Sequence, residues 1–184
     1  MTSRPSSASS RPSRRRVLSL AGLGVLGLAL AGCTEEDSLA QQANSGDQKG
    51  YIAGDGTVVS AEDLRGAPAL LNFWYAGCAP CRVEAPDLRE LAERFDGRAA
   101  FYGVNLRDEQ ATAEAFERTF EIPYPSFEDK DGGVLMALSA YVPPQAVPTT
   151  LVLDAEGRVA ARILGIAERS VLETLLEDTV AEAA

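Results

Sequence analysis

The sequence predicts an α/β domain in which a mixed central sheet is covered by helices on both faces. Apolar runs of strand length alternate with stretches of helical periodicity, which is typical of a sheet layered with helices. A four-residue turn at 154–157 separates the last two apolar runs and predicts a terminal antiparallel hairpin. With 184 residues, 46% of them hydrophobic, the chain can bury one such core and still carry extensions.

The domain is expected to begin with a short strand and a capped turn before its first core strand. Residues 57–59 predict the short strand, and residues 60–64 predict a helical turn. Ser60 fits the N-cap of that turn, and Asp63 fits the position three residues later that usually holds a glutamate. The apolar run 69–75 then predicts the first core strand.

Two helices and a second core strand follow. A helix is expected over about 79–95, and one side of it is apolar: Val83, Leu88, Leu91, Ala92 and Phe95. Residues 99–105 read as the second core strand. Residues 110–120 predict another helix, in which Ala113, Phe116 and Phe120 recur at helical spacing.

The last third of the chain predicts a connection, a short helix, the hairpin and a final helix. Residues 122–128 contain proline and read as a connection to a short helix around 132–140. The hairpin strands are 149–153 and 158–164, and an amphipathic helix covers about 168–182. A helical insert therefore separates the second and third core strands.

The motif Cys78-Ala79-Pro80-Cys81 lies where the first core strand passes into a helix. Free backbone N–H groups and the helix dipole favour a thiolate at this place. Cysteines three residues apart on a helix face the same side, close enough to alternate between dithiol and disulfide. Pro80 suits the first helical turn, because its missing N–H has no partner to lose there.

Two cysteines can also serve purposes other than redox chemistry. A structural disulfide would close a very short loop and so add little stability. Zinc is disfavoured because the chain has no histidine and its third cysteine, Cys33, is remote from the other two. A Cu(I)-binding module using the two thiolates stays open as an alternative. We expect no resident metal and no cofactor.

Two segments resemble the thioredoxin-like family, namely LNFWYAGCAPCRVEAP at 71–86 and AVPTTLVLDAEGRV at 146–159. Within that family they are most similar to the membrane-anchored, extracytoplasmic branch that includes the cytochrome c maturation reductases. The helical insert matches that branch too. The resemblance covers most of residues 56–180 and implies a thioredoxin-like fold.

The resemblance implies roles for the cysteines and for the loop before the third core strand. Cys78 would be the exposed nucleophile that attacks a substrate disulfide, and the less exposed Cys81 would resolve the mixed disulfide. Pro148 takes the position of the family's cis-proline, and the backbone of Val147 would pair with an extended substrate. Pro80 would influence the reduction potential and lie near the substrate.

The proton relay is assigned by the same resemblance to Glu84. Thioredoxins proper carry a buried aspartate at the position of Asn72, whereas the reductase branch carries a glutamate at the position of Glu84. The alternative is an exposed first-turn glutamate that only favours the helix dipole. Trp74 is expected in the core and as a wall of the substrate site, and Gly77 replaces a tryptophan found before the first cysteine in many relatives.

The N-terminal residues predict an export signal and a lipid anchor. Residues 1–32 read as a signal peptide: a basic stretch is followed by an uncharged apolar run at 17–32. The run ends at Leu30-Ala31-Gly32-Cys33, which resembles the bacterial lipobox and predicts lipidation of Cys33. An uncleaved anchor is the alternative. Residues 33–50 would form a flexible tether and 51–184 the folded domain.

The charged residues are distributed unevenly along the chain. Five arginines precede the first acidic residue, so the chain after residue 32 holds 12 basic and 27 acidic residues, a balance of −15. This argues against nucleic-acid binding. The arginines at 14–16 fit a twin-arginine signal or the general secretion route equally.

We expect a lipid-anchored, monomeric thiol–disulfide oxidoreductase on the extracytoplasmic face of the cell membrane. By resemblance it would reduce disulfides in apocytochrome c or a related partner, and a membrane protein would supply the electrons. An oxidant that introduces disulfides into exported proteins would use the same residues and stays open as an alternative.

Overall fold

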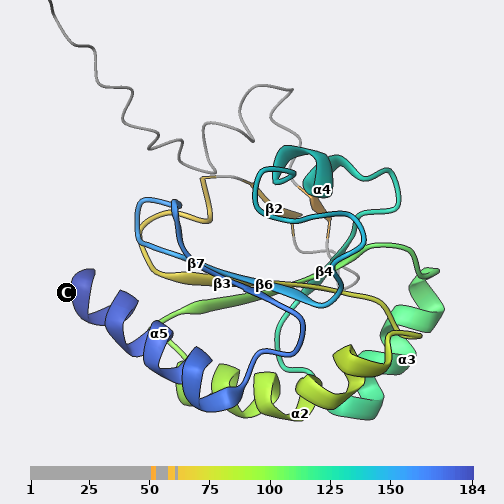
Figure 1. Cartoon of the computed structure of the whole chain (residues 1–184), viewed down its shortest axis with the longest axis horizontal. Coiled ribbons are helices and arrows are strands. Elements are labelled where there is room, and N and C mark those ends of the chain that lie inside the picture. Colours follow the sequence, from red (N-terminus) through yellow and green to blue (C-terminus); the bar gives the residue numbers. More distant parts are fainter. Residues whose placement is uncertain (1–50, 53–57, 61) are drawn as a thin grey trace, which may run out of the picture. The chain divides into compact units, whose positions relative to one another are not determined.

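A mixed five-stranded sheet forms the centre of the structure (Figure 1). The computed structural model describes residues 51–52, 58–60 and 62–184, so the expected signal peptide, lipidation at Cys33 and tether lie outside the described residues. The strand order is β5-β4-β3-β6-β7. The strands are β3 (Ala69–Trp74), β4 (Ala100–Asn105), β5 (Ser126–Glu128), β6 (Thr149–Leu153) and β7 (Val159–Leu164).

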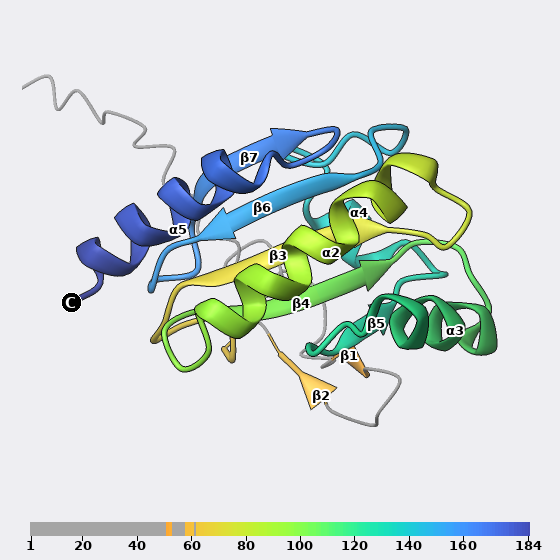
Figure 2. The ribbon, with the colours of Figure 1, turned by 90° about the horizontal axis from the view of Figure 1, so that it is seen from below.

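Helices cover both faces of this sheet, as the sequence predicts. Figures 1 and 2 show α2 (Ala79–Arg94), α3 (Gln110–Phe120) and α5 (Arg169–Glu182) on one face. The short α4 (Gly133–Ala137) lies on the other face. A two-stranded antiparallel pair, β1 (Tyr51–Ile52) and β2 (Val58–Val59), lies beside the main sheet.

The side chains of β3 alternate between two buried clusters because successive residues of a strand point to opposite faces. Leu71 and Phe73 join the cluster that includes residues of α4. Leu70 joins the cluster formed with α2 and α5. All six residues of β3 are buried, as expected for a central strand with helices on both sides.

Strand directions bring several loops to one edge of the sheet. β3 and β4 run parallel, and β6 runs antiparallel to β3. The carboxyl ends of β3 and β4 therefore meet the start of β6, where Phe73 pairs with Thr149. β7 runs antiparallel to β6 and ends at this same edge, where Leu164 pairs with Thr149. The segments before α2, after β4, before β6 and after β7 thus converge.

Two local predictions were wrong, and a third was confirmed. Residues 126–128, expected to be part of a connection, form β5, which pairs in parallel with β4. Val83, expected on the apolar side of its helix, is 63% exposed. The expected turn after residue 60 is present at 62–64, and the carboxylate of Asp63 accepts hydrogen bonds from the N–H and hydroxyl of Ser60, both at 2.7 Å.

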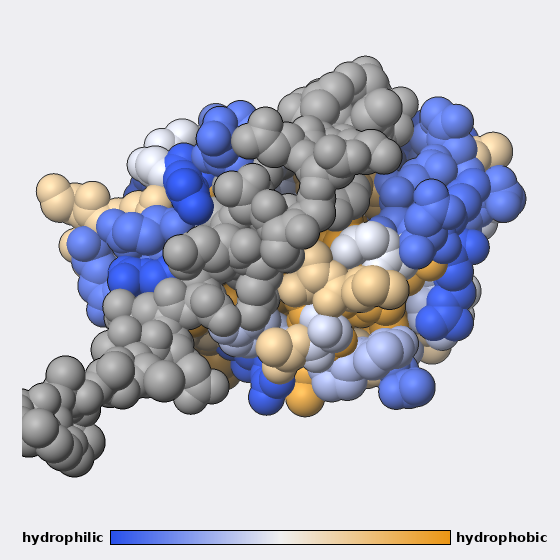
Figure 3. All heavy atoms as spheres, turned by 90° about the horizontal axis from the view of Figure 1, so that it is seen from above, coloured by the Kyte–Doolittle hydropathy of each residue, from blue (hydrophilic) through white to orange (hydrophobic). Residues whose placement is uncertain are grey.

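The face that carries α4 exposes both apolar and polar groups. Figure 3 shows a patch of apolar surface near the middle of this face, next to mainly polar surface. α4 has five residues and leaves Met136 largely exposed. No helix among the described residues is both long enough and apolar enough to cross a membrane.

A candidate active site around a disulfide

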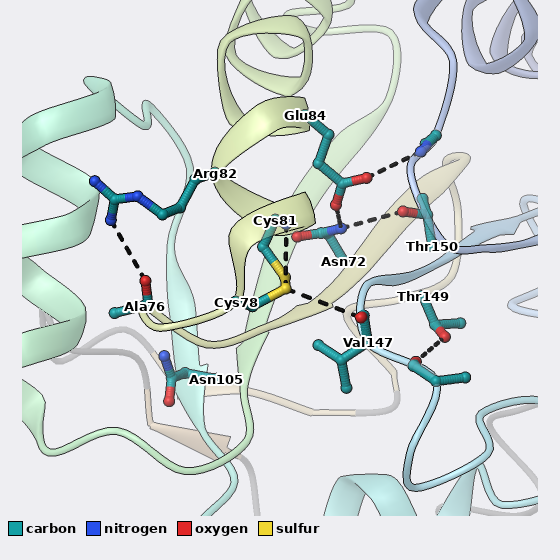
Figure 4. The surroundings of a disulfide bond; sticks show 12 residues. Asn72, Ala76, Cys78, Cys81, Arg82, Glu84, Asn105, Val147, Thr149 and Thr150 are labelled. Carbon is teal, nitrogen blue, oxygen red and sulfur yellow. Dashed lines mark hydrogen bonds between the residues drawn. A yellow bond between two sulfur atoms is a disulfide. The ribbon is translucent and has the colours of Figure 1, made fainter.

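A disulfide joins Cys78 and Cys81 at the start of α2, with 5.3 Å between their Cα atoms (Figure 4). Cys78 is the N-cap of the helix, in extended backbone conformation, and Pro80 lies in the first turn. The N–H of Cys81 donates to the Sγ of Cys78 at 3.1 Å. A thiolate on Cys78 would therefore gain a backbone hydrogen bond and the favourable end of the helix dipole.

Both cysteines are buried, so the prediction that Cys78 is exposed was wrong: each is 2% exposed. They belong to one apolar cluster with Trp74, Ala85 and Phe116. The Cys78 Sγ also lies 3.9 Å from the carbonyl oxygen of Val147. Because a disulfide sulfur carries no hydrogen, this contact becomes a hydrogen bond only when Cys78 is a thiol.

The loop before β6 lies against the disulfide. The peptide bond between Val147 and Pro148 is cis, which confirms the assignment of Pro148 as a cis-proline. Pro148 is buried and Val147 is half-buried. The carbonyl of Pro148 accepts a hydrogen bond from the N–H of Gly165 at 2.9 Å, and the hydroxyl of Thr149 donates to the carbonyl of Ala146. The backbone of Val147 thus lies next to the sulfur of Cys78, as a substrate-pairing role requires.

Glu84 lies in the interior beneath this edge, with 1% of its surface exposed. One carboxylate oxygen accepts from the side-chain amide of Asn72 at 2.8 Å, and the other accepts from the N–H of Ala167 at 2.9 Å. The same Asn72 amide donates to the hydroxyl of Thr150 at 3.1 Å. Figure 4 shows these groups on the side of the first turn of α2 that faces β6. The alternative of an exposed, helix-favouring glutamate is therefore wrong.

The pKa of Glu84 is raised to about 7. Burial is the largest cause, because removal from water disfavours the charged form. The hydrogen bonds from Ala167 and Asn72 lower the pKa in part, and the charge of Asp87 raises it slightly. Near neutral pH this carboxyl group can both accept and release a proton, as a proton relay requires.

Trp74 packs in the core, as expected, and belongs to the same apolar cluster as the two cysteines; its contact with substrate stays a prediction. The residue is 3% exposed, and its ring centroid lies 4.3 Å from that of Phe116. Pro80 is half-buried, and its neighbours Ala79 and Gly77 are exposed. The exposed residues directly before and after Cys78 therefore have small side chains, without an aromatic one at position 77.

Three charged residues that the sequence analysis did not single out hold the loop before Cys78. The N–H of Ala76 donates to the carboxylate of Asp108, which also accepts from the side-chain amide of Asn105 at 2.8 Å. The guanidinium of Arg82 donates to the carbonyl of Ala76 at 3.4 Å. The guanidinium of Arg107 lies 4.0 Å from the ring centroid of Tyr75. The position of Asp108 just after β4, at the same sheet edge as the cysteines, is the sequence signal that could have identified it.

The described residues contain no group of three or more Cys, Asp or Glu side chains arranged to hold a metal ion. Within this part of the chain, the sulfur pair and the buried carboxyl group are the chemically distinctive groups of the site. Their arrangement suits the making and breaking of S–S bonds with transfer of one proton.

Comparisons with known proteins agree with this geometry. The model of the AhpC/TSA family matches residues 40–162. The chain is 36% identical over 121 residues to the thiol:disulfide interchange protein DsbE of Pseudomonas fluorescens biotype C, covering 65% of this chain and 64% of that protein. It is 38% identical over 120 residues to the thiol:disulfide interchange protein HelX of Rhodobacter capsulatus, covering 65% of each. The chain thus spans slightly less than two thirds of the length of these relatives.

Solved structures share the fold. The crystal structure of a DsbF homologue from Corynebacterium diphtheriae superposes with a TM-score of 0.61 and 31% sequence identity, covering 71% of this chain and 85% of that one. A structure of MTB dsbF in mixed oxidised and reduced forms gives a TM-score of 0.65 at 25% identity, covering 75% of this chain and 96% of that one. The five-stranded mixed sheet with its helices is therefore the thioredoxin-like fold expected from the sequence.

Proposed function

Because the chain belongs to the AhpC/TSA family of thioredoxin-like proteins, we propose that it is a thiol–disulfide oxidoreductase that works through Cys78 and Cys81. The observation that carries the proposal is the disulfide at the N-terminus of α2, where the N–H of Cys81 donates to the sulfur of Cys78. This arrangement favours a thiolate on Cys78 when the pair is reduced. The names of DsbE and HelX as thiol:disulfide interchange proteins support the same activity.

The reaction we propose passes two electrons in two exchange steps. The Cys78 thiolate attacks one sulfur of a substrate disulfide, forming a mixed disulfide and releasing one substrate thiolate. Cys81 then loses its proton and attacks the Cys78 sulfur. The internal disulfide forms, the bond between Cys78 and the substrate breaks, and the second substrate thiolate leaves. The substrate is reduced and the protein is oxidised.

Glu84 is proposed to exchange a proton with Cys81. Its burial and its raised pKa, about 7, give it comparable amounts of acid and base form near neutral pH. The amide of Asn72 and the N–H of Ala167 fix the two carboxylate oxygens. A fixed carboxyl group on the helix that carries Cys81 can accept the proton of that thiol directly or through one water molecule.

The physiological direction we propose is reductive, with apocytochrome c or a related partner as the protein substrate and a membrane protein as the electron donor. The resemblance of segments 71–86 and 146–159 to the reductase branch supports this direction. The test is the equilibrium reduction potential of the Cys78–Cys81 pair. A value near that of thioredoxin, about −270 mV, or lower fits a reductase, whereas a value near that of strong oxidants, about −120 mV, would reverse the direction.

Mutants test the two cysteines separately. Cys78→Ser is expected to abolish exchange, and Cys81→Ser is expected to accumulate a mixed disulfide that a reductant releases. Both should be compared in a Cys33→Ser background, so that no third thiol reacts. Full turnover by either single mutant would refute the two-cysteine mechanism.

The proposed location is the extracytoplasmic face of the cell membrane, with the protein held there by lipid on Cys33. The basic stretch, the apolar run 17–32 and the lipobox-like residues 30–33 support this proposal. Each buried CH₂ of an acyl chain contributes about 0.8 kcal/mol to membrane binding. Cys33→Ser is expected to abolish labelling by a radioactive fatty acid, and unchanged labelling would contradict the anchor.

A further inference from the structure

A small cavity lies behind the disulfide, between β3, α2, α3 and the chain that leads into β5. Its polar lining comes from Asn72, Cys81, Tyr124 and Ser126. The remaining walls are apolar: Trp74, Ala85, Leu88, Phe116 and Ile122. The volume is about 10 Å³, measured as the space open to the centre of a water-sized sphere. That is about the room that one water molecule needs.

The hydroxyl of Ser126 is buried in this wall without a partner. Ser126 is 8% exposed, and its Oγ is the one buried side-chain oxygen or nitrogen atom without a hydrogen bond among the described residues. Buried hydroxyl groups in native proteins almost always bind either a protein group or an ordered water. The unpaired hydroxyl therefore indicates that a molecule is bound beside it.

Gly103 provides the space for that hydroxyl. Gly103 pairs with Ser126 across β4 and β5, and a Cβ on residue 103 would lie 2.2 Å from the Ser126 Oγ. The indole nitrogen of Trp74 would be 2.8 Å from the same Cβ. The missing side chain at Gly103 therefore lets the Ser126 hydroxyl and the Trp74 indole nitrogen approach this position closely.

We propose that one water molecule occupies this cavity, bound by the hydroxyl of Ser126 and the amide oxygen of Asn72, and that it hydrogen-bonds to the sulfur of Cys81. The Asn72 nitrogen is already used by Glu84 and Thr150. Figure 4 shows the other end of this amide turned away from Glu84. Two or more polar partners in a cavity of this size are what a buried water requires.

The water has a chemical role in the second exchange step, and this part of the inference rests on the proposed function of Cys81. Burial disfavours the Cys81 thiolate that must form before attack on Cys78. A water held by Ser126 can donate a hydrogen bond to that thiolate as its proton leaves. The bond between Cys78 and Cys81 forms and the bond between Cys78 and the substrate breaks, as in the second exchange step. Ser126 is therefore a positioning residue, which acts on Cys81 through the water.

The water itself can be observed directly. A crystal structure of the oxidised protein at a resolution that orders water should show one density peak within about 2.5–3.2 Å of the Ser126 Oγ. The peak should be absent in Ser126→Ala. An empty cavity in the wild-type protein, or a Ser126 hydroxyl bonded to a protein group in its place, would overturn the inference. The observation on the wild-type protein needs no activity and does not depend on whether the variant folds.

The role of the water is tested with a symmetrical aromatic disulfide whose thiolate is coloured. The reduced Cys33→Ser protein should release one coloured thiolate when Cys78 attacks and a second when Cys81 resolves the mixed disulfide. In Ser126→Ala the first phase should be unchanged. The second phase should be slower by about five- to tenfold at neutral pH, with its midpoint moved to higher pH, as expected for loss of one hydrogen bond to the thiolate.

The control is Thr179→Val, which removes another buried hydroxyl, one that donates to the carbonyl of Leu175 in α5, away from the disulfide. Both phases should keep their wild-type rates and pH profiles in this control. A normal second phase in Ser126→Ala at every pH would overturn the role of the water. A normal second phase in Cys81→Ser would instead refute the proposed role of Cys81.

Discussion

Replacing Glu84 with glutamine is expected to remove most of the dependence of stability on pH between about pH 5 and pH 8. The pKa of Glu84 is about 7 in the folded protein, against 4.5 for an ordinary glutamate. Between these two values the folded state binds more protons than the unfolded state. The free energy of unfolding must therefore fall as the pH rises through this window.

The size of the effect follows from the same two values. A pKa difference of this size corresponds to about 3 kcal/mol of stability, which is fully present below pH 4.5 and is lost as the pH rises through 7. Glu84→Gln keeps an oxygen that can accept from Ala167 but cannot ionise. The variant should therefore be less sensitive to pH and, at pH 8, at least as stable as the wild-type protein.

The chain is well suited to this measurement because it has no histidine, and the oxidised cysteines do not titrate. The lowered pKa values of Asp63 and Glu177, caused by their hydrogen bonds, place their titration in more acidic solution. Burial raises the pKa of Asp129, but this residue is the same in both proteins and cancels in the comparison.

Urea denaturation of the oxidised full chain in mild detergent gives the free energy of unfolding at each pH. Both proteins should carry Cys33→Ser, so that no free thiol titrates. A wild-type free energy that is constant from pH 5 to pH 8 would refute the raised pKa. An equal slope in Glu84→Gln would show that another group causes the dependence.

Two further substitutions test the supports of the site. Gly103→Ala should lower the free energy of unfolding by about 1–3 kcal/mol, because the new Cβ would lie 2.2 Å from the Ser126 Oγ; unchanged urea stability would contradict this packing. Asp108→Ala should cost about 1–3 kcal/mol and slow attack by Cys78, because the N–H of Ala76 loses its acceptor. Asp108→Asn, which keeps an oxygen acceptor, should recover most of both losses, and equal losses in the two variants would indicate a purely electrostatic role.

The long elements were predictable because their signals are local. The helix expected at 110–120 is α3, with the same bounds, since its apolar residues recur at helical spacing within one segment. The hairpin of β6 and β7 followed from two apolar runs and a short turn. β5 was missed because three residues between Pro125 and Asp129 carry little periodicity. Its strand conformation comes from pairing with β4, a contact between distant parts of the sequence.

Burial around the site was harder to predict than secondary structure. Val83 is apolar but exposed, because the buried side of α2 passes through Cys81, Glu84, Ala85 and Leu88. An apolar residue was therefore expected inside, and the charged residue next to it takes the buried position. Residue type alone predicts a buried Val83 and an exposed Glu84, since glutamate is seldom fully buried without partners. The cis-proline was predictable from family resemblance alone, because few X–Pro bonds are cis.

The buried carboxyl group explains why no single segment reveals the chemistry of this site. α2 supplies Glu84, β3 supplies the Asn72 amide that binds one oxygen, and the segment after β7 supplies the Ala167 N–H that binds the other. Burial raises the pKa and the two donors lower it, so a value near 7 is the balance of contributions from three separate parts of the chain. Removing the Asn72 amide should therefore raise this pKa further, although Asn72 itself cannot ionise. The residue that titrates and the residues that set its pKa are coupled only through the fold.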